Sequence, residues 1–274
     1  MTAIDEDALG RPDVIVVDSV TDLGPTAAGR IAVTGSHGGA FSGAFAAARG
    51  VRAALFNDAG FGLDAAGVGG VASAMFPAAA VDHRGARIGE GAETAHGLIS
   101  FVNAAAAQLG VQVGDHAARA VRLLAQAPPR SPGPDPESVA HCVDVHGVKV
   151  TLLDSASQIG TEHAHCFVAV GSHGAAPGGD PRRAVRHPVA FVAFNDAGRG
   201  KEDAGVARLA LLDRINVPAV AVAHDSARIG DGASTLFDGV VSAGNQTAHA
   251  RGVRTGERLH DLYARVGATG TTHP

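Results

Sequence analysis

Serine and histidine occur side by side in a glycine-flanked segment at two places in the chain. Gly-Ser-His-Gly occupies residues 35–38 and again residues 171–174. In a turn of this kind, backbone N–H groups can bind an anion, while the hydroxyl and imidazole groups can meet a substrate. The glycines could equally serve only the backbone angles of a tight turn. Because both occurrences contain serine and histidine, the pattern favours a functional role.

Two further polar motifs also occur twice and in the same order. Phe-Asn-Asp-Ala-Gly is found at 56–60 and 194–198, and Ala-Arg-Ile-Gly begins at residues 86 and 227, each time shortly after a histidine. Asparagine and aspartate can form a turn or supply an amide, a base or a metal ligand. The arginine can clamp a carboxylate or phosphate, since its planar fork binds two oxygens, or it can pair with Asp58 or Asp196 and tie loops together.

The constant spacing of these motifs shows that the chain contains an internal repeat. The separations are 136 residues from His37 to His173, 138 from Asp58 to Asp196 and 141 from Arg87 to Arg228. Several prolines in residues 127–138 favour an extended linker. We therefore predict a first unit over 1–126, this linker, and a second unit over 139–274.

Short apolar runs precede the motifs and alternate with longer amphipathic segments, a pattern typical of buried strands joined by helical crossovers. The sequence predicts an α/β protein with two tandem βα units, mostly parallel sheets covered on both faces in Rossmann-like or flavodoxin-like layers, and an internal pseudo-dimer. The expected helices are 40–48, 64–76, 92–109, 115–126, 202–214, 233–250 and 256–266.

The carboxyl ends of parallel strands are where open α/β sheets bind ligands, so the motifs should meet along one sheet edge in each unit. Whether the two edges face one shared cleft is a hypothesis at this point. The candidate catalytic residues are Ser36, His37, Ser172, His173, Asp196, His224 and Ser226. The candidate substrate-binding residues are Gly35, Gly38, Asn57, Asp58, His83, Arg87, Gly171, Gly174, Asn195 and Arg228.

These residue types suggest an enzyme that acts on a small polar anion. We expect hydrolysis of a C–N bond in an amide or cyclic amide, with arginine clamping a carboxylate and a serine–histidine relay such as His173 with Ser226 or His224 with Ser172, oriented by Asp196. Asp225 and Ser226 occur only in the second copy, which favours that copy for chemistry. The alternatives are a racemase or isomerase with equivalent bases on opposite sides of one carbon, a non-catalytic anion-binding module, or motifs retained only for turns and packing.

Composition excludes several classes of partner. The net charge of -5 and the 4% aromatic content without tryptophan argue against nucleic acid, and no apolar run is long enough for a membrane span. An acidic N-terminus and two cysteines lead us to expect a cytoplasmic protein with a small-molecule partner. A homo-oligomer is compatible with the sequence.

No cofactor is expected, because the common nucleotide-binding, GxSxG and HExxH motifs do not occur. Histidines and cysteines gather in 141–146 and 162–166 and suggest a divalent metal as a minority interpretation, but their spacing matches no standard zinc signature. The duplicated plan is similar in architecture to the ring-opening amidohydrolases. The Ser-Lys pairs of that family do not occur here, since Lys149 and Lys201 are the only lysines.

Overall fold

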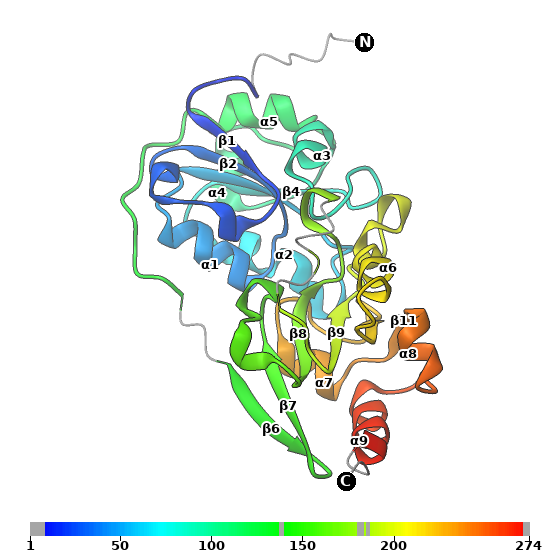
Figure 1. The fold of residues 1–274 in the computed structure, drawn as a ribbon. Helices are drawn as coiled ribbons and strands as arrows, with labels where there is room; N and C mark the ends of the chain where they lie inside the picture. The colour runs from blue at the N-terminus through cyan, green and yellow to red at the C-terminus, as the bar shows by residue number, and fades with distance from the viewer. Residues whose placement is uncertain (1–8, 137–139, 180–183, 185–186, 271–274) are drawn as a thin grey trace.

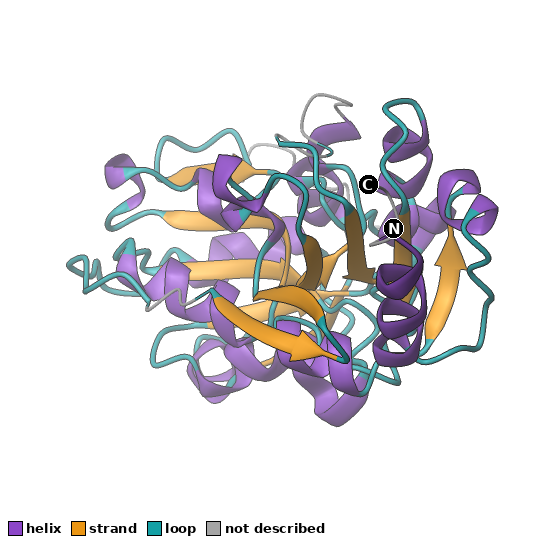
Figure 2. Cartoon of the chain, turned by 60° about the horizontal axis from the view of Figure 1, so that its bottom comes forward, coloured by secondary structure: helices purple, strands orange, loops and turns teal. Residues whose placement is uncertain are grey.

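The computed structural model describes residues 9–136, 140–179, 184 and 187–270, and it contains two sheets (Figures 1 and 2). The strands of the first sheet are β1 (Val14–Val17), β2 (Ile31–His37), β3 (Ala53–Asn57), β4 (Ala78–Val81) and β5 (Ile99–Val102), in that spatial order. The first four strands run parallel, and β5 pairs antiparallel with β4.

The second sheet repeats this order and adds a hairpin strand at one edge. Its strands are β6 (His141–Val145), β7 (Val148–Leu153), β8 (Phe167–His173), β9 (Phe191–Asn195), β10 (Ala219–Val222) and β11 (Val241–Gly244). Strands β7 to β10 are parallel, whereas β6 and β11 are antiparallel to their neighbours. The predicted α/β class with mostly parallel sheets is confirmed.

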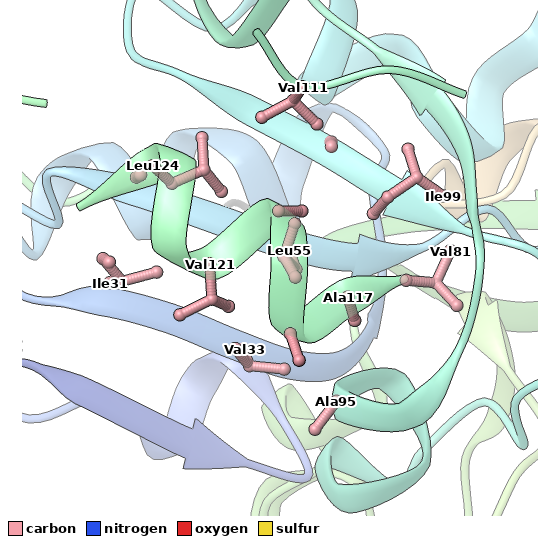
Figure 3. Close-up of a cluster of buried hydrophobic side chains, with 14 of the residues drawn as sticks. Ile31, Val33, Leu55, Val81, Ala95, Ile99, Val111, Ala117, Val121 and Leu124 are labelled. Atoms are coloured by element: carbon pink, nitrogen blue, oxygen red, sulfur yellow. The ribbon is translucent and has the colours of Figure 1, made fainter. Parts of the chain in front are cut away.

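Helices cover both faces of each sheet. They are α1 (Ala40–Ala48), α2 (Ala66–Ser73), α3 (Gly91–His96), α4 (Ala104–Gln108), α5 (Ala117–Leu124), α6 (Arg208–Asp213), α7 (Gly232–Phe237), α8 (Gln246–Ala250) and α9 (Leu259–Gly270). Figure 3 shows Val121 and Leu124 of α5 lying against Ile31, Val33 and Leu55 of the strands. The opposite face of this sheet packs against α1 and α2 through Ala46, Val68 and Val71. Small side chains thus fill a two-sided core, as the alanine- and valine-rich composition requires.

Two of the expected helices are wrong. Residues 92–109 and 233–250 each break into a helix, an antiparallel strand and a second helix, because β5 and β11 interrupt them. The start of the second helix in each segment is explained by Asn103 and Asn245. Each of these side chains accepts a hydrogen bond from the backbone N–H three residues ahead and so caps a new helix. The other expected helices overlap observed ones, although the two segments after the Phe-Asn-Asp-Ala-Gly motifs begin with 3-10 turns, Leu63–Ala65 and Lys201–Val206.

The described part of the predicted linker, residues 127–136, contains no helix or strand and runs along the outside of the first half (Figure 1). Gly133 donates a backbone hydrogen bond to Ala48 O, and Arg49 pairs with Asp135. Residues 137–139 lie outside the described part, so the predicted domain boundaries stay a prediction. No helix in the described ranges is long and apolar enough to cross a membrane.

Backbone and side chains of the two halves meet at the carboxyl ends of the central strands. Leu63 N donates to His224 O at 2.8 Å, and Lys201 N donates to His83 O at 2.9 Å. A small apolar cluster from both halves seals this contact and consists of Ala59, Ile88, Ala175, Ala197, Ala204 and Ile229. The loops that carry the repeated motifs therefore form the junction between the halves.

Candidate functional site

A cavity of about 70 Å³ lies between the two Gly-Ser-His-Gly motifs. It takes residues from the ends of β2 and β8, so the strand ends of both sheets contribute to one cavity. A volume of this size holds a few water molecules or the polar head of a small ligand. The residues that line it include Asp18, Thr21, Ser36, His37, Phe41, Ser157, Ser172, His173, Pro177 and Arg208.

His37 and His173 face each other at this cavity, and both are buried. Their ring centroids are 6.3 Å apart in an edge-to-face arrangement. Each ring also contacts the other half: a methyl group added to Gly230 would lie 3.2 Å from Cε1 of His37, and one added to Gly89 would lie 3.6 Å from Cε1 of His173. The two imidazoles are therefore held by both halves at once.

The hydrogen bonds of these two histidines define their tautomer. Nδ1 of His37 accepts from Gly39 N at 3.1 Å, and Nδ1 of His173 accepts from Ala175 N at 3.3 Å. A neutral imidazole whose Nδ1 accepts must carry its hydrogen on Nε2. Neither Nε2 atom has a hydrogen-bond partner among the described residues. Each ring thus keeps one N–H donor for a ligand.

Burial keeps both rings neutral at physiological pH. It lowers the pKa of His37 to about 4. Burial, followed by the nearby charges of His37 and Arg208, lowers the pKa of His173 well below its ordinary value. Neutral N–H donors in a water-poor cavity are suited to stabilising charge that develops on an oxygen atom.

The serines of the motif are committed partly to the backbone. Ser36 Oγ accepts from Val20 N at 2.9 Å, and Ser172 Oγ accepts from Ala156 N at 3.0 Å. The hydroxyl hydrogen of each serine is still available, since the backbone uses only a lone pair. Each serine therefore orders the loop after the preceding strand and can also donate one hydrogen bond.

Among the described residues, one cation and one carboxylate line the cavity. Arg208 is 4% exposed, donates from Nε and Nη2 to Ala175 O at 2.9 and 2.7 Å, and lies over the ring of Phe194. Its charge adds to burial and to the effect of His37 in lowering the pKa of His173. On the other side, Asp18 Oδ1 accepts from Gly91 N at 3.1 Å. The first half supplies the carboxylate and the second half supplies the cation.

The predicted binding glycines act through close packing. A Cβ on Gly35 would lie 2.3 Å from Glu90 N, and one on Gly171 would lie 2.3 Å from Asp231 N. A Cβ on Gly38 or Gly174 would lie 2.6 or 2.8 Å from its nearest neighbour. These four glycines let other backbone segments approach, and the structure shows no ligand-binding role for them.

Asn57 and Asn195 are buried, and backbone groups satisfy them. Asn57 Nδ2 donates to Ala86 O at 3.0 Å, and its Oδ1 accepts from Ala59 N at 2.9 Å. Asn195 makes the matching bonds to the backbone of Ala227 and Ala197. Both asparagines tie neighbouring loops together and do not line the cavity.

His83 and His224 form aspartate–histidine pairs at the junction, outside the cavity. Nδ1 of His83 lies 2.8 Å from Asp58 Oδ1, and Nδ1 of His224 lies 3.4 Å from Asp196 Oδ1. The hydrogen bond to Asp196 raises the pKa of His224 against the opposing effect of burial. Both rings pack on Gly60, where an added methyl group would lie 3.3 Å from each Nε2 atom. These pairs therefore brace the contact between the halves.

The expected arginine clamps form ion pairs with the protein itself. Arg87 contacts Glu90, Glu93 and Glu202 at 2.8 to 3.0 Å, and Glu202 belongs to the other half. Arg228 contacts Asp64 of the other half at 2.5 Å. Their partners differ from the expected Asp58 and Asp196, but the function is the same as in the loop-tying alternative.

The expected serine–histidine relays do not form in this structure. Ser226 Oγ donates to Ala223 O at 2.7 Å and accepts from Val240 N at 2.9 Å, so it holds a turn. Ser172 and His173 lie at the cavity, whereas His224, Asp196 and Ser226 do not line it. Adjacent motifs along one sheet edge were expected to converge on one point, but their side chains point to two places.

The histidine- and cysteine-rich segments do not form a metal cluster in the described part of the chain. Cys142 is exposed on β6, and Nδ1 of His163 accepts from Gly160 N at 2.9 Å. Among the described residues, the group whose potential ligand atoms lie close enough together to hold a metal ion is Asp58, Asp82 and His83. Asp58 Oδ1 already accepts from Gly60 N, His83 N and His83 Nδ1, which leaves this atom saturated.

Sequence reasoning missed Arg208 and Phe41 at the cavity. Arg208 has no arginine as its counterpart in the first half. The backbone N–H of Arg208 donates to Gly174 O, and in the first half the matching hydrogen bond runs from Val71 N to Gly38 O. Arg208 therefore belongs to no motif that occurs twice in the sequence. Comparison with known proteins finds no matching family model, no similar curated protein and no similar solved structure. The geometry of the cavity is therefore the basis for a functional proposal.

Proposed function

We propose that the protein is an enzyme that binds a small polar, anionic molecule in the cavity and hydrolyses a C–N bond of an amide or cyclic amide. One observation carries this proposal: two buried, neutral imidazoles from the two halves each present an unused Nε2–H at one cavity. Two such donors suit the oxygen of a carbonyl group whose charge increases during attack.

In the proposed reaction, His37 and His173 donate hydrogen bonds to the carbonyl oxygen. Water adds to the carbonyl carbon, and Asp18 accepts the proton that this water loses. Collapse of the tetrahedral intermediate breaks the C–N bond, and the proton passes from Asp18 to the leaving nitrogen. The products are a carboxylic acid and an amine, so no oxidant or cofactor is needed. The positive charge of Arg208 favours an anionic substrate and product.

The separation of the two rings favours this reaction over racemisation. A two-base racemase needs its bases on opposite sides of a carbon atom, with the substrate between them. The two rings form an edge-to-face pair with centroids 6.3 Å apart, an arrangement that favours two donors to one oxygen atom over two bases on opposite sides of a carbon atom. Their Nδ1 atoms also accept backbone hydrogen bonds, which makes them donors and not bases.

A non-catalytic anion-binding module is the second candidate. The hydroxyl groups of Ser36 and Ser172 are bonded to backbone N–H groups, and no serine–histidine pair forms at the cavity. In this alternative the same donors bind an anion without reaction. The two candidates share the site and differ in turnover.

The reciprocal contacts support a local two-fold relation between the halves. The bonds Leu63 to His224 and Lys201 to His83 match one another, as do the ion pairs of Arg228 and Arg87 across the junction. Isologous interfaces repeat each contact in this way. We propose that the halves form an internal pseudo-dimer with the cavity beside its axis.

The test measures amine release from small amides and cyclic imides that carry a carboxylate, together with ligand-dependent shifts in melting temperature. His37→Gln and His173→Gln should each lower turnover by at least tenfold, because the flexible amide no longer holds a donor in the position that the imidazole fixes beside the developing oxyanion. His260→Gln, far from the cavity on α9, is the matched control and should have wild-type activity. Anion-dependent stabilisation without turnover would favour the binding module. If no probe gives turnover or stabilisation, both candidates are contradicted.

A further inference from the structure

A second, larger hollow opens directly beside the cavity. It has a volume of about 370 Å³ and shares Thr21, Phe41 and Ser157 with the cavity. The cavity holds only a small polar group, whereas this hollow, which we call the vestibule, falls within the size range of ligand pockets. The remaining lining residues of the vestibule are Asp22, Phe45, Asp135, Pro136 and Gln158.

Two phenylalanines on α1 give the vestibule an apolar wall. Phe41 and Phe45 lie one helical turn apart, with ring centroids 6.0 Å from each other, and both are only partly buried. The guanidinium carbon of Arg49 lies 4.3 Å from the centre of the Phe45 ring. Phe41 lines both the cavity and the vestibule, so a ligand that extends from one to the other must pass over it.

The described residues of the second half offer no aromatic wall at this position. The segment after its Gly-Ser-His-Gly motif contains the short 3-10 helix Pro177–Gly179 where the first half has α1. Pro177 lines the cavity there. In the described part of the chain the site is thus asymmetric, with an apolar wall beside α1.

The charges in the vestibule distinguish it from the cavity. Asp22 and Asp135 both line it, and Arg49 pairs with Asp135. The cavity wall, by contrast, contains the cation Arg208. The buried guanidinium of Arg208 therefore favours an anionic group in the cavity.

We infer that the ligand has two parts. A monoanionic or amide head group lies in the cavity, and an uncharged apolar tail lies across Phe41 in the vestibule. This inference rests on the proposed function and adds a substrate class to it: amides with a medium-length aliphatic or arylalkyl tail that also carry one carboxylate at the head group. A dianion with a charge at both ends fits less well, because its second carboxylate would have to lie against the apolar wall of Phe41 and Phe45.

Calorimetric titration of the whole chain with acetate, butyrate, hexanoate and adipate tests the inference with product-like probes. Burial of one methylene group strengthens binding by about threefold to fourfold. The partly open vestibule should therefore give at least a tenfold gain from acetate to hexanoate. Adipate should bind more weakly than hexanoate.

Variants of Phe41 separate the tail from the head. Phe41→Ala should remove most of the affinity ratio between hexanoate and acetate, whatever its effect on acetate itself, because Phe41 also lines the cavity, and Phe41→Leu, which keeps apolar volume, should retain part of this ratio. Phe237→Ala, an exposed aromatic residue in the other half, is the control and should change neither. A tenfold gain that survives Phe41→Ala, or equal binding of all chain lengths, would overturn the inference. Failure of even acetate to bind would instead contradict the proposed function.

Discussion

The two cavity histidines make a quantitative prediction about stability at acidic pH. An unfolded chain holds its histidines at a pKa near about 6.5, whereas burial lowers the pKa of His37 to about 4 in the folded protein. Between these values the unfolded state binds more protons, so the free energy of unfolding must fall as the pH decreases. Above about pH 6.5 both states are neutral at this residue, and it adds no pH dependence.

The difference between the two pKa values fixes the size of the effect. At pH 5 the unfolded histidine is almost fully protonated and the folded one is still mostly neutral, which costs about 2 kcal/mol relative to pH 8. The loss levels off at about 3 kcal/mol below pH 4. His173 contributes in the same direction, because burial lowers its pKa as well.

Urea unfolding of the wild type and of His37→Gln at pH 8 and pH 5 measures this contribution. Glutamine does not titrate, so the variant should lose about 2 kcal/mol less than the wild type over the same pH interval. The double difference cancels the contributions of all other titrating groups that do not contact His37. Equal losses in the two proteins would refute the assignment of His37 as a neutral, buried ring. A direct NMR titration of its ring protons should show no midpoint above pH 5.

The other predictions concern the junction between the halves. Gly60→Ala should destabilise the protein by about 1 to 3 kcal/mol. Gly60 has a φ of +72°, and the new methyl group would meet His83 and His224. The control for backbone strain alone is Gly114→Ala, because Gly114 has a φ of +90° and open space around it. Arg87→Gln should cost about 1 kcal/mol and lose its effect at high salt, whereas Arg84→Gln, whose partner Asp82 belongs to the same turn, should cost less. Asn57→Ala should cost about 2 to 3 kcal/mol, since it leaves two buried backbone groups unpaired, and it should leave ligand affinity unchanged in the folded fraction.

Much of the fold could be predicted from the sequence, because buried parallel strands appear as short apolar runs with polar residues at their ends. The same signal fails for β5 and β11. Each is four residues long and half-buried, and each lies directly between two helical segments. A mixed composition of this kind has neither the apolar run of a buried strand nor a clear helical period, so pairing with β4 and β10 decides the structure there.

The candidate site could be predicted only in part, for a reason that concerns side-chain direction. Ser36, His37, Ser172 and His173 do line one cavity, as expected of strand ends that meet. Asp58 and Asp196 follow neighbouring strands, yet each carboxylate bonds to backbone N–H groups of its own turn and to the next histidine. The position of these polar residues at the strand ends could be predicted from the sequence. Whether each side chain binds a ligand or the protein backbone depends on hydrogen bonds that the spacing of the residues does not reveal.

Motifs that occur in both halves of the chain can serve the contact between the halves as well as a ligand. At the junction, Gly60 and Gly198, His83 and His224, and Arg87 and Arg228 each contact the opposite half, so a change in one copy would damage the shared interface. These residues would be retained without any ligand. The cavity and the vestibule differ in chemistry from one end to the other because of Asp18, Phe41 and Arg208. Of these, Phe41 and Arg208 have no residue of the same type at the matching position of the other half. A substrate with two different ends needs such differences, and for this reason the unmatched residues identify the direction in which it binds.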